Sequence, residues 1–440
     1  MLVEEFVSAI SGPPLSSNTA IAKHNGLYVH TLNPTYGVRT TLKNSSVAAN
    51  CVAVNDSHVF AAQQDKAYVH VYSKARGTQD AFVPFPERIR CVTLAGDVLV
   101  LGTVEGRLML WELGTGRLVS TPPRHVQPVS CVAAGPFHIL TGSDDSDVHV
   151  WSLAQLLELG SPAEHDPERS LSNHRAAITA LALSPGSNPE TSLCVSGSKD
   201  KSCILWNYHS GEPLRTLLFP SPPLCMALDP AVRALVVSTA DASLYLAEFF
   251  ARRPLLGATA EDASTVVQIT NPFGAAPPDA GPASCVDVSY DGTTLLTGHP
   301  RGQILKWDIA ENKTPVVVTN LNAAVTNLVF CPPFKMDSAS QTPAIVKPSA
   351  LAGRSYTLTT MLGTAPASSQ QDTRFDTLLN TPGFSRDVLE NAVVTAHEPG
   401  ALTAGEHELQ HQNEQLWEIV HEQRAIHKQM YRHLLGSRSS

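Results

Sequence analysis

The sequence lacks several features that would indicate a particular chemistry. Its eight cysteines include no CxxC pair, and Cys194 and Cys203 have no neighbouring His or Cys of the kind that a zinc site needs. The three acids of TGSDDSD, residues 141–147, lack the spacing and the glycine of a calcium loop and indicate a turn between two strands. We therefore expect no metal and no cofactor.

Targeting and membrane signals are lacking too. No apolar run reaches the roughly 18 residues of a membrane span, and the first residues, MLVEEFVSAISGPP, have no basic stretch typical of a signal peptide. The 31 Lys and Arg are outnumbered by 40 Asp and Glu, and the net charge of −9 argues against a strongly basic surface for nucleic acid. The short basic stretches at 74–76 and 252–253 favour ordinary solvated turns. We expect a soluble intracellular protein.

A repeat with a period near 40 residues dominates what is present. Cys51, Cys91 and Cys131 follow one another at intervals of 40 residues, each inside a short apolar word. Each word is followed by a second one that contains an aromatic residue, and Trp111 and Trp151 are also 40 residues apart. Both kinds of word have the length and alternation of β-strands and are bounded by Gly, Asp, Ser and Pro. The first words are ANCVAV, IRCVTL, VSCVAA, AITALAL, PLCMAL and ASCVDV; the second are AYVHVYS, RLMLWEL, DVHVWSL, SCILWNY, SLYLAEF and QILKWDI.

These strands with Trp-Asp-like endings resemble the WD-repeat family of β-propellers, in which each repeat forms a four-stranded blade. Only Trp307 and Asp308 form a true Trp-Asp pair. Six repeats can be read between Asn50 and Val316, and the N-terminal segment supplies a seventh. We predict an all-β, seven-bladed propeller over residues 1–350, closed by residues 323–333 on the first blade; eight blades is the alternative. Two polar or Pro-rich insertions, residues 158–175 and 251–282, interrupt the period. They are either partner-binding loops or insertions that the fold tolerates without a function.

The resemblance implies a role for four side chains in a repeat. In this family a His before the first strand, a Ser or Thr in the second strand, an Asp in the next turn and a Trp in the third form a hydrogen-bonded chain. A set of Ser, His and Asp could also indicate a catalytic triad, but the set recurs and lies in strand words, which favours a structural role. The two matching sets are His125, Thr141, Asp145 and Trp151, and His174, Ser196, Asp200 and Trp206.

The repeat stops near residue 350. Residues 351–400 are predicted to be a linker with one short helix, and residues 401–440 an amphipathic or coiled-coil helix, because residues 406–435 contain no Gly or Pro and many helix formers. Two interpretations remain open: self-association into a homodimer through this helix, or docking of the helix on the propeller or on another protein. The apolar positions of the predicted dimerisation helix are Leu409, Leu416, Ile419, Ile426 and Met430.

The order of blades, insertions and tail resembles one group of WD-repeat proteins, the pre-rRNA-processing subunit of the nuclear complex that accompanies late precursors of the large ribosomal subunit. The stretches that carry this resemblance are DVHVWSLAQLLEL, NHRAAITALAL, RTLLFPSPPLCMALDP and the C-terminal helix. It implies a scaffold in the nucleoplasm and nucleolus, with a helical-repeat subunit and a Midasin-type ATPase among its partners. It also implies a part in removing the second internal transcribed spacer and in large-subunit maturation.

Two other function classes are weighed against this scaffold. One is an interaction adaptor of another kind, such as a ubiquitin-ligase substrate receptor or a trafficking scaffold. The Trp-Asp-x-Arg word that such ligase receptors use is missing, since Trp307 and Asp308 are followed by Ile309 and Ala310. The other is an enzyme, which would need convergent acids or metal ligands where the inner-strand words supply mostly Cys, Ala, Val and Leu. We expect no catalytic residues.

Overall fold

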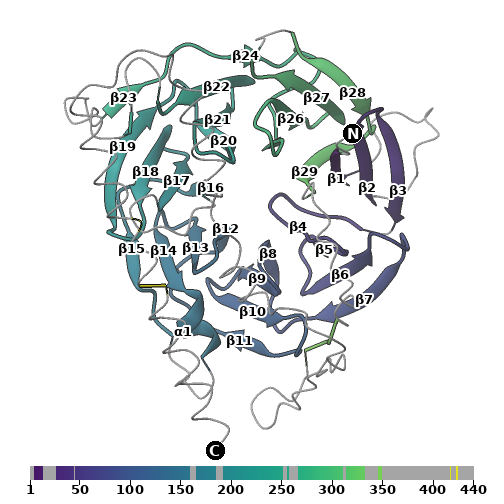
Figure 1. Cartoon of the computed structure of the whole chain (residues 1–440), viewed down its shortest axis with the longest axis vertical. Helices are drawn as coiled ribbons and strands as arrows, with labels where there is room; N and C mark the ends of the chain where they lie inside the picture. The colour runs from purple at the N-terminus through teal and green to yellow at the C-terminus, as the bar shows by residue number, and fades with distance from the viewer. Residues whose placement is uncertain are drawn as a thin grey trace, which may run out of the picture. The chain divides into compact units, whose positions relative to one another are not determined.

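Seven β-sheets stand around a central channel in the first of two compact units, Met1–Thr360 and Met361–Ser440 (Figure 1). The seven-bladed propeller predicted from the sequence is confirmed. The structure, a computed structural model, describes residues 4–12, 26–43, 45–158, 165–184, 192–250, 255–256, 266–310, 314–331 and 345–348, with Trp417, Gln423 and Arg424.

Each blade is an antiparallel meander whose strands follow one another from the channel to the rim. Blade 1 contains β29 (Ala324–Phe330), β1 (Glu4–Ser11), β2 (Gly26–Asn33) and β3 (Gly37–Lys43). Blade 2 contains β4 (Val52–Val54), β5 (His58–Ala62), β6 (Tyr68–Ser73) and β7 (Gln79–Pro84), and blade 3 contains β8 (Ile89–Ala95), β9 (Val98–Thr103), β10 (Leu108–Glu112) and β11 (Leu118–Ser120). Blade 4 contains β12 (Val129–Ala134), β13 (His138–Ser143), β14 (Val148–Ser152) and β15 (Arg169–Leu171), with the short helix α1 (Leu153–Leu157) after β14.

The remaining three blades differ in how their outer edges are completed. Blade 5 contains β16 (Ile178–Leu183), β17 (Leu193–Ser198), β18 (Ser202–Asn207) and β19 (Glu212–Leu218). Blade 6 contains β20 (Pro223–Leu228), β21 (Ala234–Thr239), β22 (Ser243–Glu248) and the two-residue β24 (Gly274–Ala275), and blade 7 contains β25 (Cys285–Val288), β26 (Thr294–Gly298), β27 (Gln303–Asp308) and β28 (Val316–Asn320). A further strand, β23 (Val266–Gln268), pairs in parallel with β19 and makes blade 5 five-stranded.

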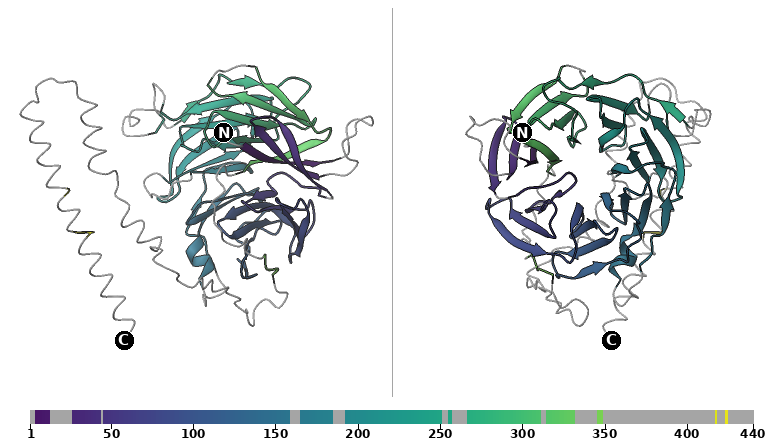
Figure 2. Two further views of the ribbon diagram at one scale, coloured as in Figure 1. Left: turned by 45° about the vertical axis from the view of Figure 1, so that its right-hand side comes forward. Right: turned by 180° about the vertical axis from the view of Figure 1, so that it is seen from behind.

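The innermost strands contact one another in an unbroken circle, from β4 through β8, β12, β16, β20 and β25 to β29 and back to β4. The view from behind shows the same circle (Figure 2). Each blade packs its two faces against its neighbours, so the core is a series of apolar layers between blades. Trp111, Trp151 and Trp206 are among the largest fully buried side chains of these layers, which is why the aromatic words recur once in each repeat.

The last strand of the propeller closes the ring on the first. β29 pairs antiparallel with β1, from Phe6 opposite Phe330 to Ser11 opposite Ala324. Its side chains also reach blade 2, where Asn327 donates to the Ala48 carbonyl at 2.7 Å and accepts from the Cys51 N–H at 3.1 Å. Closure gives blade 1 its innermost strand and gives every blade a neighbour on both faces.

The two predicted insertions contain more than loop. Arg169–Leu171, inside the first, form β15, the outer strand of blade 4. The second leaves blade 6, supplies β23 to the edge of blade 5, and returns as β24. Leu255, Val267 and Ile269 from this excursion pack against the apolar layer of blades 5 and 6. The excursion therefore covers an edge that a four-stranded blade 5 would expose.

The predicted linker, residues 351–400, lies outside the described residues. So do all five positions of the predicted dimerisation helix, Leu409, Leu416, Ile419, Ile426 and Met430. Of the predicted C-terminal helix, residues 401–440, the structure describes Trp417, Gln423 and Arg424, each with helical backbone. A self-associating helix and a docked helix both stay predictions.

Candidate interaction sites and the polar networks of the blades

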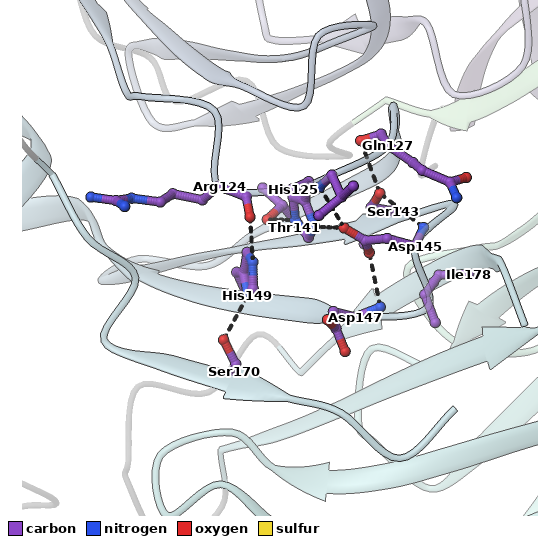
Figure 3. A network of polar contacts seen from close by, with 12 residues as sticks. Arg124, His125, Gln127, Thr141, Ser143, Asp145, Asp147, His149, Ser170 and Ile178 are labelled. Carbon is purple, nitrogen blue, oxygen red and sulfur yellow. Dashed lines mark hydrogen bonds and ion pairs between the residues drawn. The ribbon is translucent and has the colours of Figure 1, made fainter. Parts of the chain in front are cut away.

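The first predicted set of polar residues meets inside blade 4 (Figure 3). The Trp151 indole N–H donates to Thr141 Oγ1 at 3.0 Å, His125 Nε2 lies 2.9 Å from the same oxygen, and His125 Nδ1 lies 3.0 Å from Asp145 Oδ2. A neutral His125 with its proton on Nδ1 satisfies all three contacts, because the threonine hydroxyl then donates to Nε2 and the imidazole donates to the carboxylate. The indole thus donates to the hydroxyl, the hydroxyl donates to the imidazole, and the imidazole donates to the carboxylate.

The second predicted set repeats this arrangement in blade 5. Trp206 donates to Ser196 Oγ at 2.8 Å, His174 Nε2 lies 2.7 Å from that oxygen, and His174 Nδ1 lies 3.0 Å from Asp200 Oδ2. The structure therefore brings together each of the two sets that the sequence singled out. In both, the histidine comes from the loop before the inner strand and the acid from the turn after the second strand.

The two carboxylates hold the loops of their blades through backbone donors. Asp145 accepts the N–H of Val126 and of Asp147, each at 3.0 Å. Burial acts to raise the pKa of Asp145, but the hydrogen bonds from His125 and from these two amides outweigh it and lower the pKa to about 2. Burial likewise acts to raise the pKa of Asp200, but donors that include Ser202, the Arg175 amide and His174 lower it. Both carboxylates are therefore charged near neutral pH, and each accepts several hydrogen bonds.

The geometry does not suit a catalytic triad. Ser196 is completely buried, and its oxygen already accepts the Trp206 indole and contacts His174. A nucleophilic serine needs an exposed hydroxyl with space for an acyl or phosphoryl group above it. The Ser–His–Asp contacts instead fix the loop, the turn and the third strand of one blade relative to one another.

Two further polar networks escaped the sequence reasoning. In blade 7 the Trp307 indole donates to Thr297 Oγ1 at 2.9 Å, which also lies 2.9 Å from His299 Nε2, and His299 Nδ1 donates to the Gly281 carbonyl at 2.8 Å. The signal was present, because Thr297 precedes Trp307 by the same ten residues that separate Thr141 from Trp151.

The second missed network lies in blade 1. Ser8 Oγ is 2.8 Å from His30 Nε2, and Tyr36 contacts the other ring nitrogen at 3.2 Å. Ser8 and His30 are both completely buried, and the imidazole stacks on Phe6. Burial lowers the pKa of His30 to about 4, so this imidazole is neutral near pH 7. No Trp marks this blade in the sequence, which is why the network was not foreseen.

The cysteines fill space between blades. Seven of the eight are buried and Cys225 is half-buried. The Cys51 thiol points at the Arg90 carbonyl of the next blade at 3.1 Å, and the Cys91 thiol at the Val129 carbonyl at 3.5 Å. Burial raises the pKa of Cys51 and Cys131 to about 12. These thiols are neutral and inaccessible, which is the state of a packing residue.

The propeller surface has two hollows that differ in size and lining. One, of about 230 Å³, lies among turns of blades 2 to 4, where Arg88 and Arg90 face Asp65 and Asp144. The other, of about 430 Å³, is an apolar groove between β22 and the excursion after it, lined by Leu246, Ile269, Phe273 and their neighbours. Among the described residues, no cluster of His, Cys, Asp and Glu could hold a metal ion, and no helix could span a membrane.

The sequence profile of the WD domain, G-beta repeat, matches residues 116–152 and 165–207. Each matched stretch begins in or just before the outer strand of one blade and ends at or just after the Trp of the next blade. The two stretches contain both predicted polar sets. This chain belongs to the WD-repeat family.

Curated WD-repeat relatives match the chain over a longer stretch. WD repeat-containing protein 18 of Danio rerio is 26% identical over 300 residues, 67% of this chain and 68% of that protein. Pre-rRNA-processing protein crb3/ipi3 of Schizosaccharomyces pombe is 24% identical, over 61% of this chain and 66% of that protein. Pre-rRNA-processing protein IPI3 of Mycosarcoma maydis is 30% identical, over 44% and 36%. The chain is similar to these IPI3 and WD repeat-containing protein 18 relatives, and it spans at most about two thirds of their length.

Proposed function

We propose that this WD-repeat protein is a non-catalytic scaffold of a ribosome-biogenesis complex. In this role it is required for pre-rRNA processing at the second internal transcribed spacer and for maturation of the large subunit. The observation that carries the proposal is the similarity, over up to 61% of the chain, to proteins that are named for pre-rRNA processing. Such a scaffold acts in the nucleoplasm and nucleolus.

The use of polar side chains inside the blades supports a scaffold over an enzyme. In the two predicted sets, the Ser, Thr, His and Asp side chains are all engaged in contacts with Trp indoles, with one another or with loop amides. What remains for other molecules is the rim and the two surface hollows, which offer shape, apolar area and mixed charge. Those features recognise protein segments rather than activate a substrate.

The proposed partners are a helical-repeat subunit of the same complex, the pre-large-subunit particle and a Midasin-type ATPase. The net charge of −9 favours protein surfaces over bare RNA as the direct contact. A homodimer through residues 401–440 would present two propellers to these partners at once, which raises effective concentration without any new contact. The C-terminal segment and the propeller therefore have separable tasks in this proposal.

The test replaces the endogenous protein with a tagged full-length chain and with a chain that ends at residue 400. Full-length chain is expected to recover a helical-repeat subunit and large-subunit precursors in affinity purification, identified by mass spectrometry. Its depletion is expected to raise the amount of precursor RNA that retains the second internal transcribed spacer, measured by hybridisation. Recovery of cullin-ligase or coat components instead, with unchanged precursor RNA, would overturn the proposal in favour of an adaptor of another class.

A further inference from the structure

Blade 3 lacks the acceptor that the tryptophans of blades 4, 5 and 7 use. In those blades the indole donates to a Thr or Ser ten residues earlier in the chain. The residue ten positions before Trp111 is Leu101, which has no oxygen in its side chain. Trp111 is completely buried and its indole can only donate, so its N–H needs an acceptor from elsewhere.

The acceptor comes from a segment 235 residues further along the chain. The Trp111 indole donates to the carbonyl of Val346 at 3.0 Å, and the Val346 N–H donates to the carbonyl of Leu113 at 2.9 Å. Both backbone groups of Val346 are thus held, one by a side chain of blade 3 and one by its backbone. Two convergent hydrogen bonds of this kind recognise an extended backbone whatever its side chains.

Gly116 makes this approach possible. It has a φ of +73°, and a Cβ atom built on it would lie 2.7 Å from the Lys347 carbonyl oxygen and 2.8 Å from a methyl carbon of Val346. Ile345 packs against the apolar layer that contains Trp111 and Leu113. The contact therefore recognises the peptide in three ways. Two hydrogen bonds hold its backbone, the missing side chain of Gly116 leaves room for residues 346 and 347, and the apolar layer accepts the side chain of Ile345.

The position of this contact differs from the place where the ring closes. β29 ends at Phe330 in blade 1, Cys331 follows it, and the described residues resume at 345–348, on blade 3. In the sequence, residues 332–344 separate the two places. A chain that simply followed β29 would leave the propeller at blade 1.

We propose that Trp111, Leu113 and Gly116 form a peptide seat, and that residues 345–347 of the same chain occupy it. The seat holds residues 345–347 on blade 3. This inference goes beyond the role in ribosome biogenesis and does not depend on it. The ligand class is an extended peptide with an apolar residue followed by a residue whose N–H and C=O are both free.

Hydrogen exchange in the full-length chain tests occupancy. The Val346 amide is expected to be protected, and Trp111→Phe, which keeps an aromatic ring but removes the indole N–H, is expected to speed its exchange about tenfold or more. The amide of Val150, in blade 4, reports on the fold and is expected to exchange equally in both proteins. Fast exchange of Val346 in the unchanged chain would overturn the proposal.

A peptide added in trans tests the seat itself. A labelled peptide with the sequence QTPAIVKPSA, residues 341–350, is added to the full-length chain and to Ile345→Asp, which places a charge against the apolar layer. The proposal expects the peptide to bind Ile345→Asp at least about tenfold more tightly than the unchanged chain, where the seat is taken. Equal affinity for both proteins, or binding to neither, would overturn it.

A pair of glycine variants supplies the matched control in the Ile345→Asp background. Gly116→Ala places a methyl group where residues 346 and 347 lie, whereas Gly114→Ala meets nothing within 4 Å. The first substitution is expected to abolish peptide binding and the second to leave it unchanged, with the exchange of Val150 unaltered in both. Undiminished binding to the Gly116→Ala protein would show that the peptide sits elsewhere.

Discussion

The carboxylates of Asp145 and Asp200 each hold one imidazole and two backbone amides in place. Each is within hydrogen-bond reach of a buried imidazole and accepts the amide of the residue after that histidine and an amide of its own turn. A carboxylate with this many donors remains charged in a half-buried place. The consequence is that the loop entering a blade and the turn inside it cannot move independently.

Loss of one indole should therefore cost more than its apolar area alone. Trp206→Ala is expected to lower the free energy of unfolding by about 3–5 kcal/mol, because it opens a cavity between blades and leaves Ser196 without its donor. Urea denaturation followed by circular dichroism measures this. Val126→Ala is the control, since Val126 is 92% exposed and its loss should change stability by less than about 0.5 kcal/mol. Equal effects of the two substitutions would contradict the prediction.

The buried imidazole of His30 makes stability depend on pH. Burial lowers its pKa to about 4, so between pH 6.5 and 4 the unfolded chain binds a proton that the folded chain does not. The neutral imidazole makes its full contribution to the free energy of unfolding above pH 6.5. That contribution is lost as the pH falls towards 4, and the loss reaches up to about 3 kcal/mol. His30→Gln should flatten the dependence of the unfolding free energy on pH across this window, measured by urea titrations.

The Asp287 carboxyl changes stability with pH in the opposite direction and supplies the control. Burial raises the pKa of Asp287 to about 6, against the hydrogen bonds from the Phe330 and Val288 amides. The folded chain therefore holds its proton better than the unfolded chain below pH 6, and stability from this group falls as the pH rises from 4 to 6. Asp287→Asn should make the slope of stability with pH steeper. An unchanged slope in both variants would contradict the two assignments.

At the scale of the strand, the inner edge of three blades is built around one cysteine and one glycine. In blades 3, 4 and 7 the cysteine of the inner strand lies opposite a glycine of the second strand, as in the pair of Cys91 and Gly102. The inner strands of blades 3 to 6 also have a β-bulge just before this position. A bulge turns the strand towards the channel, and the glycine gives the thiol its space.

Two glycines of second strands, Gly298 opposite Cys285 and Gly197 opposite Ala180, are predicted to differ in their tolerance to a methyl group. A Cβ on Gly298 would lie 2.5 Å from Cys285 Sγ and 2.6 Å from Val325 Cγ1, both held by the packing of two blades. A Cβ on Gly197 would meet, at 2.6 Å, the terminal methyl of Met226, which can turn away. Gly298→Ala should destabilise the propeller by about 1–3 kcal/mol and Gly197→Ala by clearly less. Thermal unfolding of both variants measures the two losses of stability. A larger loss for Gly197→Ala than for Gly298→Ala would contradict the prediction.

The sequence predicts most of these elements because their pattern is repeated. A strand word with Cys or Trp recurs every 40 residues or so, and the spacing of Thr141, Asp145 and Trp151 recurs one blade later in Ser196, Asp200 and Trp206. The sequence does not predict the network of blade 7, because its histidine stands at a different position in the repeat. His299 follows its threonine by two residues instead of coming from the loop before the inner strand. β23 and β24 are three and two residues long and carry no alternation that a sequence could show.

The contact between Val346 and Trp111 marks a deeper limit of sequence reasoning. Its signal is an absence, namely Leu101 in place of a hydroxyl, and its partner is 235 residues away. Local propensity cannot connect two such positions, because the contact depends on which blades the closed ring brings near residue 346. The sequence pattern therefore predicts repeated contacts within a blade better than single contacts between distant segments.

For the whole molecule, the main open prediction concerns association through the tail. If residues 401–440 form the predicted dimerisation helix, deletion of residues 400–440 should halve the mass measured by light scattering. Leu416→Asp combined with Ile419→Asp should do the same, because charges in the apolar seam separate the helices while the ring stays folded. Circular dichroism in the β region is the control for the ring. An unchanged mass in both proteins would favour a docked helix.

The pairing of β29 with β1 has a consequence for biosynthesis. A polypeptide emerges from the ribosome starting at its N-terminus, so the mostly buried strand Glu4–Ser11 is made first and its partner Ala324–Phe330 is made last of all the strands. Until then one backbone edge of Glu4–Ser11 has no native neighbour and is open to pairing with other nascent chains. Messages that stop shortly before codon 324 should therefore yield insoluble product, whereas those that stop after the propeller should not.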